Sequence, residues 1–197
     1  MEMRYSSAHK AKTRSRILKR AAQRFRENGV RGTGIARLMS QLGLTHGGFY
    51  GHFENKNDLV AAALSAMCQE FVESLTPVVE SAPRGNKLQV LVETYLSPEH
   101  RDDPGRGCPF PALVLDITRL PGEVRQSFTG EFSRRMKYWA KYMPGSDNEK
   151  RRENAALLFA GMAGTMMIAR AVSDSGLSDN ILAEARKFYA AAFQRLG

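Results

Sequence analysis

Apolar residues recur at helical spacing along almost the whole chain, and turn-forming residues separate the periodic segments. The first segment covers about residues 7–28, and Asn28 and Gly29 supply its stop because both tolerate the left-handed conformation. Its apolar stripe consists of Ile17, Leu18, Ala21, Ala22 and Phe25, and lysines and arginines fill the other faces. The pattern predicts an amphipathic basic helix followed by a turn.

Three further helical segments follow in close succession. Thr33 is placed to cap a helix that ends at Gly43. Thr45 is placed to cap a very short helix, and Asn55 caps a long amphipathic one that continues to the region of Pro77 or just past it. The N-terminal part of the chain is therefore predicted to hold three helices, with the second and third separated by a tight turn.

The rest of the chain also alternates between helical patterns and breaks. Helices are predicted over residues 87–97, 111–119, 121–143, from about 148 to 171, and 181–196. The segments 97–109 and 173–180 are predicted to be irregular, and the apolar run 155–171 predicts a helix that is buried on most faces. No strand pattern and no repeat is found. An all-α fold follows, with a small N-terminal domain (1–54) and a larger helical body (55–197).

The net charge of +9 is confined to the first part of the chain. Residues 1–56 contain 12 Lys and Arg against 3 Asp and Glu, whereas the remainder contains 17 of each sign. A basic segment on a neutral body is typical of a module that binds a polyanion, either nucleic acid or an anionic membrane, although a solvated basic face has the same composition. The membrane is the weaker alternative because the apolar stripe of the first helix is needed inside the domain.

Cysteine content and hydropathy indicate the compartment. The chain has 2 cysteines, which make no disulfide framework, and a reducing cytoplasm is expected. No uninterrupted apolar stretch reaches the ~20 residues that cross a bilayer. The polar, basic N-terminus lacks the apolar core of a secretory signal. No membrane association is expected.

The three N-terminal helices form a predicted helix-turn-helix, whose third helix must enter a major groove about 12 Å wide. Its rear face has to contact the other helices, and Leu44, Phe49 and Phe53 are suited to that task. Its groove-facing residues should be small or polar. These are Thr45, His46, Gly47, Gly48 and Tyr50.

The segment "TGIARLMSQLGLTHGGFYGHFENKNDLV", residues 33–60, resembles the TetR/AcrR (tetracycline-repressor-like) regulators. The family's Tyr-x-His-Phe-x-x-Lys-x-x-Leu ending falls on Tyr50, His52, Phe53, Lys56 and Leu59. The preceding "RSRILKRAAQRFRENGVRGT" resembles the family's first helix and turn, so the resemblance covers about a third of the chain. The sequence departs from the pattern at Leu38-Met39, where the family usually has Ile-Ala, and at Leu42, where it usually has Ala.

The resemblance implies a role for each matching residue. Thr33 would offer its hydroxyl and backbone N–H to a phosphate at a helix start. Base edges would be approached by Thr45, His46, Gly47 and Gly48, and phosphates would be held by Tyr50, His52 and Lys56. Core packing of Tyr50, and a capping or packing role of His52, remain the alternatives.

The body resembles the family's ligand-binding and dimerisation half at the level of helix pattern. The resemblance implies a homodimer through the last two helices, bound to a palindromic operator with half-sites about 34–36 Å apart. Small residues would let these helices approach closely, namely Gly161, Ala163, Gly164 and Ala169, beside Leu157, Phe159, Met162, Ile168, Phe188, Tyr189 and Phe193. The protein would act as a repressor that a small-molecule or thiol-reactive effector releases from DNA.

An apolar effector pocket between the middle helices is the hypothesis for the body, and plain core packing is its alternative. Its candidate residues are Met67, Phe71, Tyr95, Cys108, Phe110, Leu113, Met136, Trp139 and Met143. No catalytic set emerges, so the effector would be bound and not turned over. No cofactor and no metal is expected, because the histidines and cysteines lack metal-ligand spacing.

Cys108 supports two competing hypotheses besides an ordinary buried position. It is expected at a helix start, with Arg101 and Arg106 near in sequence, and both features lower a thiol pKa, so it could sense an oxidant or electrophile. Alternatively Cys108 and His100 could be the nucleophile and base of an enzyme. That enzyme would need no basic N-terminus, so a non-enzymatic DNA-binding regulator is the preferred prediction.

Overall fold

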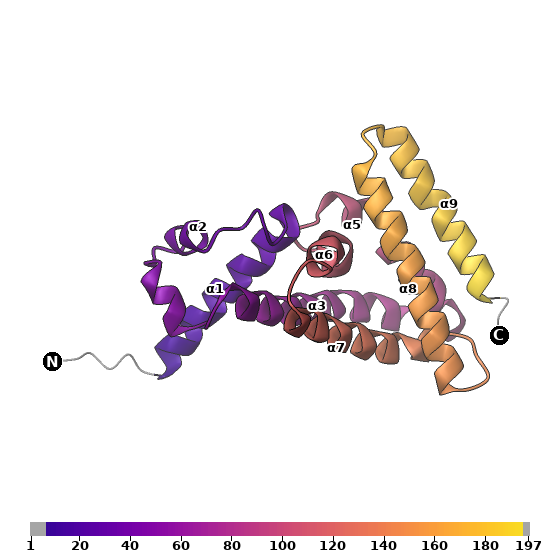
Figure 1. Cartoon of the computed structure of the whole chain (residues 1–197). Helices are drawn as coiled ribbons and strands as arrows, with labels where there is room; N and C mark the ends of the chain where they lie inside the picture. Colours follow the sequence, from indigo (N-terminus) through magenta and orange to yellow (C-terminus); the bar gives the residue numbers. More distant parts are fainter. Residues whose placement is uncertain (1–6, 195–197) are drawn as a thin grey trace.

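In the computed structural model, residues 7–194 are described, and they form a purely helical array without strands (Figure 1). The helices of the first half are α1 (Ser7–Asn28), α2 (Ile35–Ser40), the 3-10 helix η1 (Gly47–Gly51), α3 (Lys56–Ser81), η2 (Arg84–Asn86) and α4 (Lys87–Tyr95). Those of the second half are α5 (Pro98–Asp102), α6 (Pro109–Ile117), α7 (Gly122–Trp139), η3 (Ala140–Tyr142), α8 (Asn148–Ala171) and α9 (Ser175–Gln194). The predicted all-α fold is confirmed.

The helices form two groups at opposite ends of the molecule, and α3 extends between the groups. Figure 1 shows α1, α2 and η1 grouped at one end and the antiparallel pair α8 and α9 at the other. The long helix α3 contacts α1 near its start and lies along α7 further on. Buried apolar residues form one cluster that extends from Ile17 on α1 to Phe193 on α9. The core is therefore continuous across the predicted domain boundary at 54/55, and that boundary stays a prediction.

Helix α3 begins as its sequence predicts. The Asn55 side chain accepts a hydrogen bond from the Asp58 backbone N–H at 3.0 Å, and the Asp58 carboxylate accepts one from the Glu54 N–H at 3.2 Å. Both bonds satisfy amide groups that have no partner within the first turn of a helix. The helix then passes through Pro77 and ends at Ser81.

Two segments predicted to be irregular are partly helical. Within 97–109, Ser97 caps α5 by accepting the His100 backbone N–H at 3.1 Å, and Pro98 starts the helix with its fixed backbone angle. Helix α9 begins at Ser175 and not at 181, because the Asp174 carboxylate accepts the Leu177 N–H at 2.8 Å. Side-chain caps outweighed the local Pro, Gly and Ser content in both places. The last two residues of the predicted 181–196 helix lie outside the described residues.

The prediction that the apolar run of α8 is buried on most faces is wrong. One face is buried, but Leu157 and Ile168 on the opposite face are 65% and 58% exposed. Among the described residues α8 is long and apolar enough, by length and composition, to cross a membrane, and a core helix of a soluble protein can have the same character. Helix α8 also contacts α9, where the bare backbone of Gly161 admits Tyr189. A Cβ there would lie 2.6 Å from the tyrosine oxygen.

Candidate nucleic-acid interface

The turn between α2 and η1 is set by Gly43, whose φ of 70° is a left-handed conformation that L side chains rarely adopt. The Leu44 N–H reaches back to the Met39 carbonyl at 2.9 Å, and the Gly43 N–H reaches the Ser40 carbonyl at 3.0 Å. These bonds satisfy carbonyl groups at the C-terminal end of α2, and the chain changes direction after them. The tight turn of the predicted helix-turn-helix is therefore present.

The segment after the turn forms a single short helix of the 3-10 type. The N-cap of η1 is His46 and not the predicted Thr45, but the Thr45 hydroxyl accepts the Gly48 N–H at 3.2 Å. Three of the five residues of η1 are glycine, which is a poor helix former, and this composition accounts for a short, tightly wound element in place of an α-helix.

The inner and outer faces of η1 differ as the sequence predicts. Phe49 and Phe53 are fully buried and stack with their ring centroids 5.6 Å apart. Tyr50 is 58% exposed and rests edge-on against the rings of Phe49 and His46. Thr45, His46, Gly47 and Gly48 are all exposed. The core-packing alternative for Tyr50 is therefore not supported.

The glycines of η1 are not required by packing within the chain. A Cβ added to Gly47 or Gly51 would have no heavy atom within 4 Å. One added to Gly48 would lie 3.3 Å from the Thr45 hydroxyl. Bare backbone on an outward face that the chain itself leaves open is what close approach to another molecule requires.

A basic cluster lies beside the end of η1. The Arg14 guanidinium of α1 stands 4.6 Å from the centre of the Phe53 ring. Burial lowers the pKa of His52, and the positive charges of Lys10 and Arg14 lower it further. Its Nδ1 atom is buried without a hydrogen-bond partner. His52 is thus a half-buried imidazole surrounded by cations, and an incoming phosphate would stabilise its protonated form.

Lys56, at the first position of α3, is half-buried. Burial lowers the pKa of its amine, while the Asp116 carboxylate acts in the opposite direction. The contact of Lys56 with a phosphate stays a prediction.

The predicted cap and phosphate contact at Thr33 do not fit the structure. The N-cap of α2 is Gly34, and Thr33 is buried. Its hydroxyl donates to the carbonyls of Gly29 and Arg24 at 3.0 and 3.2 Å, and its N–H donates to the Val30 carbonyl. The hydroxyl and the N–H of Thr33 therefore donate to carbonyls in and before the turn that follows α1. Carbonyls at the end of a helix have no partner within the helix and need such donors.

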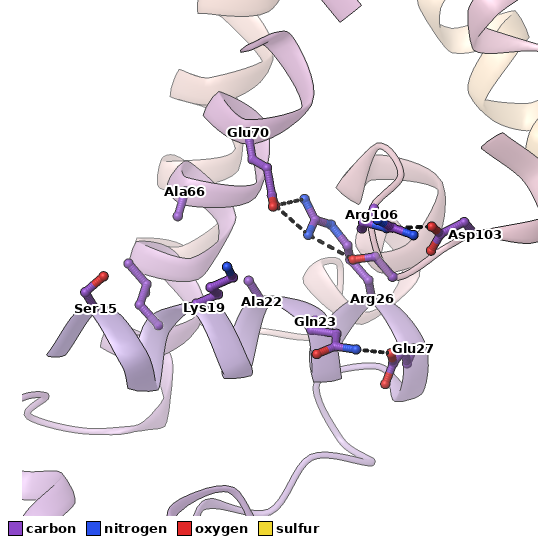
Figure 2. Close-up of a pocket in the computed structure, with 12 residues that line it drawn as sticks. Ser15, Lys19, Ala22, Gln23, Arg26, Glu27, Ala66, Glu70, Asp103 and Arg106 are labelled. Atoms are coloured by element: carbon purple, nitrogen blue, oxygen red, sulfur yellow. Dashed lines mark hydrogen bonds and ion pairs between the residues drawn. The ribbon is translucent and has the colours of Figure 1, made fainter. Parts of the chain in front are cut away.

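Besides the shared apolar core, buried polar contacts join α1 and the turn after it to the body. Arg26 of α1 is buried and donates to Glu70 of α3 through both terminal nitrogens at 2.9 Å, and to the Gly105 carbonyl at 3.1 Å (Figure 2). It lines a cleft of about 640 Å³ between α1, α3 and the loop before α6. Further along, the Val30 N–H donates to the Asp116 carboxylate of α6 at 2.6 Å.

The nine predicted pocket residues are all buried, and the structure brings most of them together as packed core. Tyr95, Trp139 and Phe110 pack their rings around Phe159 with centroid separations of 5.1–5.9 Å. Phe71 lies against Tyr95 and lines a separate hollow of about 240 Å³ beside His100. Phe159 is the central residue that sequence analysis did not place in this group. A ligand among these residues therefore requires them to move, and the pocket stays a prediction.

Cys108 lies at the start of α6, as predicted, but its thiol is not activated. Burial raises the pKa of the Cys108 thiol, and the residue is 1% exposed. The two arginines expected beside it turn elsewhere: Arg101 pairs with Asp102 and Asp179, and Arg106 pairs with Asp103. The prediction of a reactive, low-pKa thiol is wrong for this conformation, because desolvation exceeds the effect of the helix start.

The Cys108–His100 nucleophile–base pair is also not formed. The Nε2 atom of His100 accepts the backbone N–H of Cys108 at 2.9 Å, and Nδ1 lies 2.6 Å from the Tyr95 carbonyl. Both ring nitrogens therefore bind backbone, which fixes the proton on Nδ1. Burial lowers the pKa of His100 to about 4. The imidazole joins α4, α5 and the start of α6, and Gly107 leaves room for its ring.

Comparison with known proteins identifies this arrangement. Residues 17–63 match the sequence profile of "Bacterial regulatory proteins, tetR family". The chain belongs to the TetR family. The matched residues include the part of α1 from Ile17 onward, α2, the glycine-rich η1 and the first turns of α3.

Among curated relatives, TtgR, an HTH-type transcriptional regulator of Pseudomonas putida, is 34% identical over 87 residues. ArpR of the same species, a probable HTH-type transcriptional regulator, shows the same identity over the same length. Each alignment covers 42% of this chain and 41% of the relative. The alignable sequence thus spans about two-fifths of the length of these relatives.

Solved structures resemble the whole chain. A TetR-family regulator from Cytophaga hutchinsonii has a TM-score of 0.76 at 21% identity and covers 92% of this chain and 95% of its own. Reduced NemR from E. coli has a TM-score of 0.73 at 18% identity, with coverage of 89% and 96%. At these identities the likeness extends the TetR fold to the body but assigns no residue there.

Proposed function

We propose that this TetR-family chain is a DNA-binding transcriptional repressor that binds operator DNA through the outer face of η1 and the basic surface of α1. The observation that carries the proposal is the two-sided η1, with Phe49 and Phe53 buried and with exposed Thr45, His46, Gly47, Gly48 and Tyr50. The bare backbone of Gly47 and Gly48 would approach base edges. Tyr50, His52 and Lys56 would hold phosphates, which supply affinity and register.

The charge distribution supports the same partner. The N-terminal 56 residues carry the whole net charge of +9, and the exposed residues of α1 include Lys10, Lys12 and Arg16. Neutralising phosphates with such side chains releases counterions from DNA and makes the affinity depend steeply on salt. An anionic membrane would not use the exposed glycines of η1.

A homodimer through α8 and α9 is part of the proposal. The exposed apolar residues Leu157, Ile168 and Phe188 lie on these two helices and suit a symmetric contact between copies. Phe159, Met162 and Phe193, which the sequence also suggested for this contact, are buried in the chain's own core and are left out. Two copies would present two η1 segments to the halves of a palindromic operator.

The body would bind a small effector that lowers operator affinity, without turning it over. The attachments of Arg26 to Glu70 and Gly105, and of Val30 to Asp116, are the contacts through which a shift of α3 or α6 would reach the DNA-binding end. A cytoplasmic location fits a regulator of this kind with two free cysteines.

The proposal is tested by titrating labelled DNA from upstream of this gene and its neighbours, followed by fluorescence anisotropy. We expect preference for a fragment that contains an inverted repeat over a scrambled fragment. The affinity should fall by about a thousandfold or more between roughly 50 and 200 mM salt. Equal, salt-insensitive binding to both fragments, or no binding, would overturn it.

A further inference from the structure

Helix α1 carries five arginines, and only Arg14 among them has no polar partner in the described chain. The other four are matched by a carbonyl, amide oxygens or a carboxylate: Arg16 by Leu42, Arg20 by Gln23 and Gln41, Arg24 by Glu27, and Arg26 by Glu70. Arg14 is exposed, and no acceptor or carboxylate of residues 7–194 bonds to it. Its charge and its N–H donors are therefore available to another molecule.

Arg14 is nevertheless held in place. Its guanidinium lies over the Phe53 ring, 4.6 Å from the ring centre, which is the distance of a cation–π contact. Phe53 is 2% exposed and stacks on Phe49, so the ring is itself fixed in the core. This contact positions the charge but gives the N–H donors no acceptor. A guanidinium that is fixed without hydrogen bonds has less side-chain entropy to lose when it binds an anion.

The fixed cation lies beside the end of η1, where a second group also lacks a partner. His52 is the C-cap residue of η1 and directly precedes Phe53 in the chain. The Nδ1 atom of His52 is buried without a hydrogen-bond partner. Burial lowers the pKa of His52, and the positive charges of Lys10, Arg14 and His9 on α1 lower it further. The pKa shift thus agrees with the ring contact in placing Arg14 next to this imidazole.

No counter-ion compensates these cations within the described chain. The charged groups that shift the pKa of His52 are all positive. Asp58, the nearest aspartate along the chain, accepts the Glu54 N–H at the start of α3. The described ion pairs of α1 lie toward its C-terminal end, at Arg24 and Arg26. Because like charges held together repel one another, an anion from outside the chain would stabilise this cluster.

We propose that Arg14 is a phosphate-binding residue of the DNA interface, and that Arg14 and His52 hold one backbone phosphate of the operator between them. Arg14 donates paired N–H groups to the phosphate oxygens, a geometry that suits a guanidinium. The match to the family profile begins at residue 17, after Arg14, so it gives this residue no role. The inference rests on the proposed function only in taking the phosphate from operator DNA.

Binding at this site is coupled to a proton. In the free protein the surrounding cations and burial keep the pKa of His52 below its ordinary 6.5. The phosphate offsets the cations and raises that pKa, so the imidazole takes up a proton from the buffer as the phosphate binds. A protonated His52 binds the anion more tightly than a neutral one. The affinity for phosphate should therefore be highest at low pH and fall as the pH rises through the free and bound pKa values.

The first experiment needs no DNA. The His52 imidazole of the full chain is followed by NMR over about pH 5 to 8, with and without inorganic pyrophosphate. We expect pyrophosphate to raise the titration midpoint of His52 in the wild type and to leave it unchanged in Arg14→Met. The two conditions are compared within each variant, because loss of the Arg14 charge alone raises the starting midpoint. Methionine is chosen because its side chain can still cover the Phe53 ring.

Arg20→Met is the matched control for this titration. It removes a guanidinium from the same helix, but one that already donates to the Gln41 side chain at 3.2 Å. Its His52 midpoint should respond to pyrophosphate as in the wild type. A midpoint that pyrophosphate does not move, or moves equally in Arg14→Met and Arg20→Met, would overturn the proposal.

The second experiment counts phosphate contacts on the operator. Each contact contributes about 0.9 to the slope of log affinity against log salt concentration. Arg14→Met should lower this slope by about one contact and weaken operator binding by about tenfold at low salt. Arg14→Lys should keep the slope but restore only part of the affinity, because an ammonium lacks paired donors. An unchanged slope in Arg14→Met contradicts a phosphate contact at this residue.

The two proposals fail in different ways. A chain whose His52 responds to pyrophosphate through Arg14, but which prefers no operator fragment, contradicts the proposed function alone. A chain that binds its operator with a salt slope that Arg14→Met leaves unchanged contradicts the phosphate site alone.

Discussion

The two ends of this molecule expose different chemistry. At the N-terminal end, η1 presents glycine backbone, a threonine, a histidine and Tyr50, and its phenylalanines point inward. At the other end, α8 and α9 present Leu157, Ile168 and Phe188 to solvent. A polar, basic face suits a hydrated polyanion, and an apolar face suits a second protein surface. The two ends of the chain thus suit two different partners, DNA at the N-terminal end and a second protein surface at α8 and α9.

The largest expected effect tests the inner face of η1. Phe53→Ala should lower the free energy of unfolding by ~3–5 kcal/mol, because the ring is fully buried and its loss leaves a cavity. Urea denaturation followed by circular dichroism measures this, and operator binding should be lost with it. A stability unchanged within error would mean that Phe53 does not anchor η1.

The next test concerns the apolar end. Phe188→Glu should convert the dimer to monomer, because it places a charge in the centre of the proposed contact. Operator affinity should fall by about 30-fold or more, the loss expected for a central interface residue. Sedimentation velocity gives the assembly state. Leu115→Glu is the control, since Leu115 is 57% exposed on α6 and should leave the dimer intact. A persistent Phe188→Glu dimer would place the interface elsewhere.

The pH dependence of stability tests the burial of His100 in the body. The folded pKa of His100 is lowered to about 4, below the ordinary 6.5, so the unfolded chain binds the proton more readily. Stability should therefore be full above pH 6.5 and decline as the pH falls toward 4, by about 3 kcal/mol for this residue. His100→Gln should flatten the slope in denaturation measured across this range. An unchanged slope would contradict the assignment.

The smallest expected effect concerns the outer face of η1. Tyr50→Phe should weaken operator binding by about tenfold through loss of a phosphate hydrogen bond, with the unfolding free energy unchanged. Anisotropy and denaturation on the same sample separate the two quantities. An unchanged operator affinity together with a lower unfolding free energy would show that Tyr50 serves packing and does not bind phosphate.

Sequence pattern predicted the N-terminal end closely because its signals are local. Gly43 adopts positive φ, the side chains of Thr45 and Asn55 each accept a backbone N–H of the helix that follows, and Phe49 and Phe53 are both buried. Thr33 was misplaced for a local reason too. Its hydroxyl had two carbonyls of the preceding turn within reach, and pattern alone could not rank these against a helix start.

The body was predicted only as a set of helices. An apolar stripe has the same sequence whether it faces a core or a second subunit, so Phe159 and Leu157 could not be told apart before the structure placed them. Cys108 illustrates another limit. Its position at a helix start was local and correct, but its pKa depends on burial by distant residues.

Crosslinking shows directly which exposed face of the protein contacts DNA. A photo-crosslinking p-azidophenylalanine is placed at Tyr50 in one variant and at Val78 in another. Tyr50 is in η1 and is 58% exposed. Val78 is near the end of α3 and is 45% exposed. We expect crosslinks to labelled operator DNA from position 50 and none from position 78. Crosslinking from position 78 with none from position 50 would contradict the proposed DNA interface.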